Sequence, residues 1–312
     1  MARRLLVSDP LSARAVAALR ATPGLDVEER KGLSEEQLIQ LVAPIDAWIV
    51  RSATKVTRRL IDAAPELRWV ARAGAGLDNI DVEAARARGI TVLNVPGANA
   101  VAVAELTFGL LIALLRQIPA ADASLRRGEW DRARWKGGEL RGRTLGIVGL
   151  GRIGRAVAAR ARAFEMPCVG HDPYVDGASI RALGVEPLPL EALLPRAQIL
   201  TLHLPLTPET RGLIGAAELA KLPRGALVVN AARGGLVDEE ALHAALRSGA
   251  LGGAALDVFA TEPPGASSLL SLPNVVATPH VGAATAEAQE AVGEEIVRLL
   301  VASMREAGAI SG

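Results

Sequence analysis

The stretch Leu145-Gly-Ile-Val-Gly-Leu-Gly-Arg-Ile-Gly154 decides how this chain folds. Its first residues are apolar and predict a buried strand, and Gly149, Gly151 and Gly154 follow with the spacing G-x-G-x-x-G. The residues after Gly154 are apolar and helix-forming, as in Ala156-Val-Ala-Ala159. We therefore expect a strand, a tight turn and a helix, an arrangement that brings bare backbone up to a pyrophosphate.

Each glycine of this motif has a separate expected task. Gly149 permits the tight turn, Gly151 leaves room for phosphates, and Gly154 lets the helix pack closely on the strand. The N–H groups at the start of the helix then face the negative charge. The same spacing also occurs in glycine-rich turns of unrelated α/β proteins. A second predicted strand, Cys168–Asp172, supports the dinucleotide interpretation, because it ends in an acid 18 residues after Gly154.

The acid at the end of that strand bears on which dinucleotide is bound. Asp172 stands where a carboxylate accepts hydrogen bonds from ribose hydroxyls and repels a 2′-phosphate. Pro173 and Tyr174 follow it and supply no cation for such a phosphate. The sequence therefore predicts NAD rather than NADP as the cofactor. The alternative is local, because an Asp before a Pro often forms a turn.

Composition narrows the class of protein. A length of 312 residues predicts two domains, and 50% hydrophobic with 22% charged residues is typical of globular proteins with large cores. A net charge of +1 favours neither nucleic acid nor an anionic membrane as a partner. Cys168 is the single cysteine, so we expect no internal disulfide, no cysteine metal cluster and no metal site, and we expect Cys168 to be a small buried side chain.

Neither the start of the chain nor its most apolar segment predicts membrane targeting. Only a short apolar run follows the basic residues of Met1–Arg4, which is not the pattern of a secretion signal. Val101–Leu115 contains Glu105 and is too short to span a bilayer, so it predicts a buried or interface helix. We therefore expect a cytoplasmic protein.

Strand-like and helix-like segments alternate along the whole chain, which predicts parallel sheets covered by helices on both faces. The N-terminal third predicts strands at Leu5–Ser8, Leu25–Glu28, Ala47–Val50, Trp69–Arg72 and Thr91–Val95. Its predicted helices are Ser12–Arg20, Ser34–Leu41 with a capping box of Ser34 and Gln37, Thr57–Ala64, and Asp81–Arg88 ending at Gly89.

The rest of the chain repeats this alternation around the glycine motif. The predicted strands are Thr144–Val148, Cys168–Asp172, Ile199–Leu204, Leu227–Asn230, Gly253–Val258 and Val275–Thr278. Thr285–Arg305 predicts a long helix that returns to the first domain, which would leave a hinge and a cleft between the two. The predicted fold is therefore α/β with two doubly wound parallel sheets. A Rossmann NAD-binding domain, residues 98–284, is inserted in a flavodoxin-like substrate domain, residues 1–97 and 285–312.

Three side chains with the chemistry for hydride transfer follow predicted strands of the second domain. Such a reaction needs a base for a hydroxyl proton, a cation for a carboxylate and a fixed substrate orientation. Arg233 follows Leu227–Asn230, Glu262 lies in Asp257-Val-Phe-Ala-Thr-Glu262, and His280 follows Thr278-Pro. Each could instead be an ordinary loop residue. Their shared place, after strands downstream of a dinucleotide motif, favours a common site. For His203 we favour a structural or cofactor-side role.

At this point the sequence resembles the D-2-hydroxyacid dehydrogenase family, and within it the phosphoglycerate dehydrogenase subgroup. The resemblance covers nearly the whole chain and is carried by Val50–Val56, Arg72–Asn79, Ala104–Leu106, Gly149–Arg155, Asn230–Asp238, Ala255–Pro264 and Pro279–Thr285. It implies that His280 is the acid–base residue, that Glu262 orients its ring and favours its imidazolium form, and that Arg233 binds the substrate carboxylate.

The resemblance also assigns binding residues. It implies that Asp257 lies near the nicotinamide carboxamide and that Arg152 and Ile153 contact the pyrophosphate, beside Gly149, Gly151, Gly154 and Asp172. On the substrate side it implies Arg51, Ser52, Arg72, Gly74, Ala75, Gly76, Asn99 and Arg132, the last of which a neighbouring subunit could donate. Ordinary surface salt bridging remains the alternative for these arginines.

The expected activity is NAD-dependent oxidation of D-3-phosphoglycerate to 3-phosphooxypyruvate, an early step of serine biosynthesis. The alternatives are a glyoxylate/hydroxypyruvate reductase or another enzyme of the family, and a corepressor-like protein that senses NADH without needing turnover. The expected partner is a phosphorylated 2-hydroxy or 2-oxo acid, and the chain is expected to form a homodimer or homotetramer. Because the sequence stops at Gly312 without the regulatory domain of longer members, we expect no serine feedback through such a domain.

Overall fold

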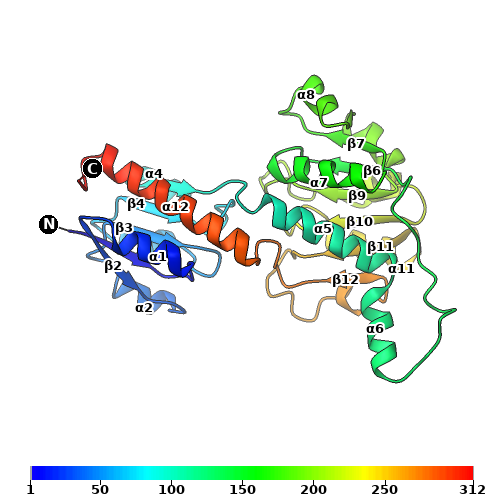
Figure 1. Ribbon diagram of the computed structural model, residues 1–312, viewed down its shortest axis with the longest axis horizontal. Coiled ribbons are helices and arrows are strands. Elements are labelled where there is room, and N and C mark those ends of the chain that lie inside the picture. The colour runs from blue at the N-terminus through cyan, green and yellow to red at the C-terminus, as the bar shows by residue number, and fades with distance from the viewer. Residues whose placement is uncertain (1, 312) are drawn as a thin grey trace. The chain divides into compact units, whose positions relative to one another are not determined.

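The computed structural model describes residues 2–311, and they divide into two compact units. One unit contains the residues up to Asn99 and those from Ala284 on, and the other contains Ala100–Ala283. The predicted ends of the first domain, residues 1 and 312, lie outside the described residues. Each unit is built on a parallel sheet, coloured blue to cyan in the first and green to orange in the second (Figure 1).

The sheet of the first unit has five parallel strands in the order β2-β1-β3-β4-β5, which is the flavodoxin-like order. Successive side chains of a strand point to opposite faces, and here both faces are apolar: Leu5 and Val7 pack in one core and Leu6 in another. The strands are β1 (Arg3–Val7), β2 (Leu25–Glu29), β3 (Ala47–Val50), β4 (Trp69–Arg72) and β5 (Thr91–Asn94).

Helices cover both faces of this first sheet. On one face α12 packs beside α1, and Leu19, Ile296 and Leu300 are buried there. The other face is covered by α2, α3 and α4. The predicted capping box of Ser34 and Gln37 is present at the start of α2. The helices are α1 (Ala13–Arg20), α2 (Glu35–Ile39), α3 (Arg58–Asp62), α4 (Val82–Ala87) and α12 (Ala286–Glu306).

The second unit has a seven-stranded parallel sheet in the order β12-β11-β10-β9-β6-β7-β8. The chain starts at the centre with β6, builds outward through β7 and β8, then returns to the other side of β6 with β9. This reversal is the point at which doubly wound sheets bind ligands. The strands are β6 (Leu145–Val148), β7 (Cys168–His171), β8 (Glu186–Pro187), β9 (Ile199–Leu202), β10 (Ala226–Asn230), β11 (Leu251–Leu256) and β12 (Val275–Ala277).

Helices again cover both faces. Helices α5 and α7 pack together on one face, where Phe108 and Phe164 stack with their ring centroids 5.1 Å apart. Helices α9, α10 and α11 cover the other face. The helices are α5 (Ala100–Leu115), α6 (Ile118–Arg126), α7 (Arg152–Ala163), α8 (Gly177–Ala182), α9 (Leu190–Leu193), α10 (Ala216–Lys221) and α11 (Glu239–Arg247), with 3-10 turns at Leu194–Arg196 and Leu269–Ser271.

The predicted fold class of two parallel-sheet α/β units is confirmed, with three corrections of detail. The sequence predicts six strands in the second unit and the structure has seven. The strand that was not predicted is β8, which is only two residues long. The strand predicted at Ile199–Leu204 ends at Leu202, and the one predicted at Gly253–Val258 is Leu251–Leu256. Within residues 2–311 no single helix could cross a membrane by length and apolar character, although the pair α5 and α6, bent by 61°, meets that test jointly.

Candidate active site

The glycine turn joins β6 to α7 and leaves open space at the start of the helix. A Cβ on Gly149 would lie 2.4 Å from the carbonyl oxygen of His203, and one on Gly154 would lie 2.0 Å from the carbonyl oxygen of Gly149. These two glycines are required by the protein's own packing. Among residues 2–311, a Cβ on Gly151 would meet nothing within 4 Å, and no side chain caps the N–H groups that follow it. The turn therefore fits a ligand's phosphates.

Two arginines flank this turn. Arg155 donates from Nε to the carbonyl oxygen of Leu150 at 3.0 Å and so braces the turn, a contact that the sequence did not reveal. Arg152 begins α7 and is exposed, with Ile153 beside it half-buried. Their predicted contacts with a pyrophosphate stay predictions.

Asp172 follows β7 directly and ties that strand to the glycine turn. Its Oδ2 accepts the N–H of Leu150 at 2.8 Å, and its Oδ1 accepts the N–H of Tyr174 at 2.9 Å. The second bond is the local turn that was the alternative interpretation. Asp172 also lines a hollow of about 310 Å³ that is bordered by residues of β7, α8 and β8. Arg181 lines the same hollow, and sequence reasoning missed this cation because it lies in α8 rather than directly after the strand.

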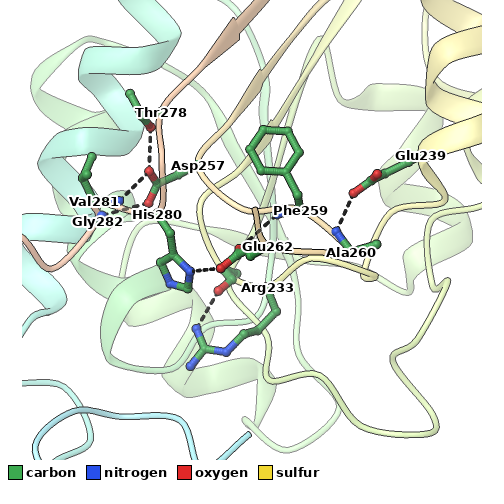
Figure 2. A network of polar contacts seen from close by, with 11 residues as sticks. Arg233, Glu239, Asp257, Phe259, Ala260, Glu262, Thr278, His280, Val281 and Gly282 are labelled. Carbon is green, nitrogen blue, oxygen red and sulfur yellow. Dashed lines mark hydrogen bonds and ion pairs between the residues drawn. The ribbon is translucent and has the colours of Figure 1, made fainter. Parts of the chain in front are cut away.

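The three predicted chemical residues follow three neighbouring strands. Arg233 comes after β10, Glu262 after β11 and His280 after β12, and these strands are adjacent in the sheet. Figure 2 shows the three side chains in one cluster. His280 Nδ1 lies 2.7 Å from Glu262 Oε2, and the two side chains are 44% and 38% exposed, so the pair is open to substrate and solvent. Arg233 Nη1 donates to the carbonyl oxygen of Ala232 at 2.6 Å.

Backbone contacts fix the turns that carry this cluster. Glu262 Oε1 accepts the N–H of Phe259 at 3.1 Å, so both of its carboxylate oxygens are engaged. The backbone of Gly234, next to Arg233, approaches the same turn so closely that a Cβ there would lie 1.8 Å from the carbonyl oxygen of Phe259. The loops of Arg233 and Glu262 are therefore packed backbone against backbone.

The side chain of Asp257 holds the turn that carries His280. Its carboxylate is fully buried and accepts hydrogen bonds from Thr278 Oγ1 at 2.6 Å and from the N–H groups of Val281 and Gly282 at 2.8 Å each (Figure 2). Its carbonyl oxygen accepts the N–H of His280, whose φ is +53°. Sequence reasoning missed this role, and the predicted contact of Asp257 with the nicotinamide stays a prediction.

Two other titratable side chains of this unit are buried. His203 is buried beside the glycine turn, its Nε2 lies 3.0 Å from Thr201 Oγ1, and burial lowers its pKa to about 3, which suits a neutral structural role. Cys168 is buried as predicted, and burial raises the pKa of its thiol to about 11. Within residues 2–311 no group of three or more His, Cys, Asp or Glu is arranged to hold a metal ion.

The predicted substrate-binding residues lie mostly on two loops of the first unit. The Arg51 loop is fixed by Asp9, whose Oδ2 accepts the N–H groups of Arg51 at 2.5 Å and of Thr54 at 3.1 Å. Asn79 adds bonds to the carbonyl oxygens of Arg51 and Thr54 at 2.6 Å each. Sequence reasoning missed both of these anchors. Ser52 is exposed on this loop.

The second loop contains Gly74, Ala75 and Gly76. The Arg72 guanidinium lies over it, so that a Cβ on Gly74 would be 1.9 Å from Arg72 Nη1. Asn94 donates from Nδ2 to the carbonyl oxygen of Ala75 at 2.6 Å. The buried Oδ1 of Asn99 has no hydrogen-bond partner among residues 2–311. Gly76, also on this loop, is half-buried, and Arg132 is exposed in the second unit. The roles of all these residues in substrate binding stay predictions.

Comparison with known proteins assigns the family. Residues 108–282 match the model of the D-isomer specific 2-hydroxyacid dehydrogenase, NAD binding domain. The chain belongs to this family. This match confirms two predictions: that the chain belongs to a family of NAD-dependent dehydrogenases, and that its cofactor is NAD.

Relatives and solved structures agree with this assignment. The chain is 49% identical over 308 residues to the D-3-phosphoglycerate dehydrogenase of Methanocaldococcus jannaschii, covering 97% of this chain and 58% of that protein. It resembles the crystal structure of the TT0316 protein from Thermus thermophilus, with a TM-score of 0.89, 40% identity and 97% of both chains covered. A glyoxylate reductase from Paecilomyes thermophila gives a TM-score of 0.89 at 32% identity, covering 99% of this chain and 97% of that one. The chain spans little more than half of the length of the curated relatives, 55% to 58%.

Proposed function

We propose that this chain catalyses the NAD-dependent oxidation of D-3-phosphoglycerate to 3-phosphooxypyruvate. The observation that carries the proposal is the cluster of His280, Glu262 and Arg233 in a chain 49% identical to a protein named D-3-phosphoglycerate dehydrogenase. That cluster supplies a base, a carboxylate partner and a cation for an anionic substrate, which are the groups that oxidation of a 2-hydroxy acid requires.

The geometry of the cluster assigns a task to each atom. Nδ1 of His280 is bonded to Glu262, so Nε2 is the ring nitrogen that takes the proton of the C2 hydroxyl. Glu262 stabilises the imidazolium that results. The guanidinium of Arg233 binds the substrate carboxylate through paired hydrogen bonds and fixes the position of C2. In the reverse direction the imidazolium returns the proton to the oxygen of the keto group.

The cofactor would be held in the second unit. Gly149, Gly151 and Gly154 with the start of α7 would bind its pyrophosphate, helped by Arg152 and Ile153, and Asp172 would bind the adenosine ribose. When bound, NAD supplies a nicotinamide ring that accepts the hydride from C2. The fully buried Asp257 supports this arrangement by fixing the turn of His280.

Selectivity for a phosphorylated substrate is assigned to the first unit. We propose that Arg51, Ser52 and Arg72 contact the phosphate, that Gly74–Gly76 and Asn99 contact the substrate, and that Arg132 of a neighbouring subunit adds a further cation. Paired guanidinium groups suit a phosphate because each binds two of its oxygens. We propose in addition that the chain acts in the cytoplasm, in serine biosynthesis, and assembles as a homodimer or homotetramer.

The decisive experiment is a comparison of substrates by steady-state kinetics. We expect kcat/KM for the phosphorylated pair to exceed that for glyoxylate or hydroxypyruvate by roughly 100-fold, since a site built for a phosphate discriminates strongly against substrates that lack one. The reverse order would favour a glyoxylate/hydroxypyruvate reductase, a candidate supported by the structural similarity to the glyoxylate reductase. The same panel with NAD and NADP measures the preference for the cofactor.

A single variant separates an enzyme from a protein that only senses NADH. We expect His280→Ala to bind NADH as the wild type does and to lose about 10²- to 10⁴-fold in kcat, the usual contribution of a general base. Fluorescence titration gives the affinity and stopped-flow absorbance gives the turnover. An unchanged kcat would remove His280 from the mechanism and leave the binding function as the alternative.

A further inference from the structure

We propose that Glu239 is a positioning residue for the His280–Glu262 pair. Its carboxylate holds the turn Phe259–Glu262 in the conformation that aims Glu262 at the imidazole. Nothing in the family assignment gives Glu239 this role. The proposal rests on the proposed function only in that His280 transfers the proton, and it applies to any 2-hydroxy acid the chain oxidises.

A chain of three hydrogen bonds leads from α11 to the imidazole. Glu239 Oε1 accepts the N–H of Ala260 at 2.6 Å. In the same turn the N–H of Phe259 donates to Glu262 Oε1 at 3.1 Å, and Glu262 Oε2 lies 2.7 Å from His280 Nδ1. Figure 2 shows these contacts in one row, with Glu239 at the end farthest from His280. Glu239 therefore anchors the residue next to Phe259, whose N–H holds the Glu262 carboxylate.

The exposure of the pair explains why such a brace is needed. The side chains of His280 and Glu262 are 44% and 38% exposed, and ion pairs this open to water contribute little to their own alignment. The alignment must come from the backbone that carries them. The turn of His280 is held by the buried carboxylate of Asp257, which accepts backbone N–H groups of that turn. The carboxylate of Glu239 accepts a backbone N–H of the turn of Glu262 in the same way.

Glu239 is available for this task because another residue caps its helix. Asp238 is the N-cap of α11, and its carboxylate accepts the N–H groups of Glu240 and Ala241 at 3.0 Å each. Glu239 is the first residue of the helix and its carboxylate turns toward Ala260 instead. It also lies six positions after Arg233 and five after Gly234, whose backbone packs on Phe259. The segment Arg233–Glu239 thus carries the arginine proposed to bind the substrate carboxylate and also contacts the turn that carries Glu262.

Glu240 provides a matched control. It has the same charge, is exposed, and lines the same hollow of about 240 Å³ beside Thr261 as Glu239 does. Its carboxylate makes no hydrogen bond or ion pair within residues 2–311. A change at Glu240 therefore removes the same charge from the same helix end and leaves the bond to Ala260 intact.

Five variants test the proposal, assayed with whichever 2-oxo or 2-hydroxy acid the wild type converts fastest. We expect Glu239→Ala to lower kcat by about tenfold with NADH affinity and Tm close to wild type, since small misplacements of reacting groups cost rate rather than binding. Glu239→Gln keeps an acceptor oxygen and should restore kcat to within about twofold, and Glu240→Ala should also stay within that range. In the Glu262→Ala background, adding Glu239→Ala should lower kcat no further, because Glu239 acts only through Glu262.

Additive losses in the double variant, failure of Glu239→Gln to restore kcat, or an equal loss in Glu240→Ala would each overturn the proposal. A second readout does not depend on turnover. The chain has four histidines, so the imidazole ¹⁵N and Nδ1 proton signals of His280 can be assigned by their absence in His280→Gln. We expect these signals to move in Glu239→Ala toward their positions in Glu262→Ala, and to stay in Glu239→Gln and Glu240→Ala. Unmoved signals in Glu239→Ala contradict the proposal, whereas absent activity on 3-phosphoglycerate contradicts only the proposed substrate.

Discussion

At the scale of single residues, the glycine turn separates space used by the protein from space left for a ligand. A Cβ on Gly154 would lie 2.0 Å from the carbonyl oxygen of Gly149, whereas one on Gly151 would meet nothing within 4 Å. The two positions are three residues apart, Gly151 as the N-cap of α7 and Gly154 inside it, and they differ in what surrounds them. The same methyl group should therefore have opposite effects on stability and on binding at the two sites.

We expect Gly151→Ala to unfold at the wild-type temperature within about 2 °C and to bind NADH at least about tenfold more weakly, since the methyl group enters the space for the phosphates. Gly154→Ala should cost roughly 1–3 kcal/mol of stability by overpacking. Thermal unfolding and fluorescence titration measure the two effects. A stable Gly151→Ala variant with unchanged NADH affinity would show that the phosphates bind elsewhere.

A second prediction at this scale concerns the buried His203. Burial lowers its folded-state pKa to about 3, below the value of about 6.5 in the unfolded chain. The unfolded state therefore binds a proton that the folded state excludes, and stability falls as pH drops from about 6.5 toward 3. Between pH 7 and pH 5 this amounts to about 2 kcal/mol.

Urea unfolding at both pH values tests this linkage. We expect His203→Gln to lose about 2 kcal/mol less than the wild type over this interval, because it has no group to protonate there. His243→Gln leaves His203 in place and should follow the wild type. Parallel losses in His203→Gln and the wild type would mean that the ring of His203 takes up its proton in the folded state.

At the scale of elements, the sequence predicts long apolar segments well and short polar ones poorly. The bounds of β3 and β4 match their predictions at both ends, because apolar residues buried on both faces make up β3 and all of β4 except its last residue, Arg72. Strand β8 was missed, since two residues, one of them a proline, carry no periodicity. The strand predicted to Leu204 was too long because apolar residues continue past its last ladder bond.

The residues of the candidate site also fall into a group that the sequence predicts and a group that it does not. Arg233, Glu262 and His280 could be predicted because each follows a strand, and parallel strands bring their carboxyl ends to one edge. The partners of those residues could not. The bond from Glu239 to Ala260 and those from Asp257 to the turn after Thr278 join positions more than 20 residues apart, and they depend on turn geometry that no local pattern contains.

The close contact of α1 and α12 gives a prediction at this scale. A Cβ on Gly293 would lie 3.0 Å from the Cβ of Ala15 and 3.1 Å from Oγ of Ser12, the N-cap of α1. We expect Gly293→Leu to lower stability by roughly 1–3 kcal/mol, because the larger side chain forces the helices apart. Gly293→Ala should cost less, since the gain in helix propensity offsets part of the contact. Equal unfolding free energies in urea for the wild type and Gly293→Leu would contradict this packing.

At the scale of the whole molecule, the exposed apolar side chains of α5 and α6 bear on the proposed assembly. Val101 is 56% exposed on α5, and Leu125 is 55% exposed on α6. We expect light scattering to give at least twice the chain mass of 32.5 kDa, and Leu125→Glu to shift the protein toward that single-chain mass, because a charge is costly in an apolar interface. A wild type of 32.5 kDa would contradict the proposed dimer. An unshifted Leu125→Glu would exclude α6 from the contact.

The first unit is formed by two separate segments of the chain, and this affects how it folds during synthesis on the ribosome. Ile296, Leu300 and Met304 of α12, with other residues after Ala284, complete a core whose remaining members come from the first 99 residues. A nascent chain must therefore wait, with one face of its first sheet covered only by α1, until some 200 further residues have emerged. The continuous second unit is complete at Ala283, shortly before α12 follows it. This inverts the usual order in which N-terminal domains mature first, and it makes the early segment the one most dependent on chaperones.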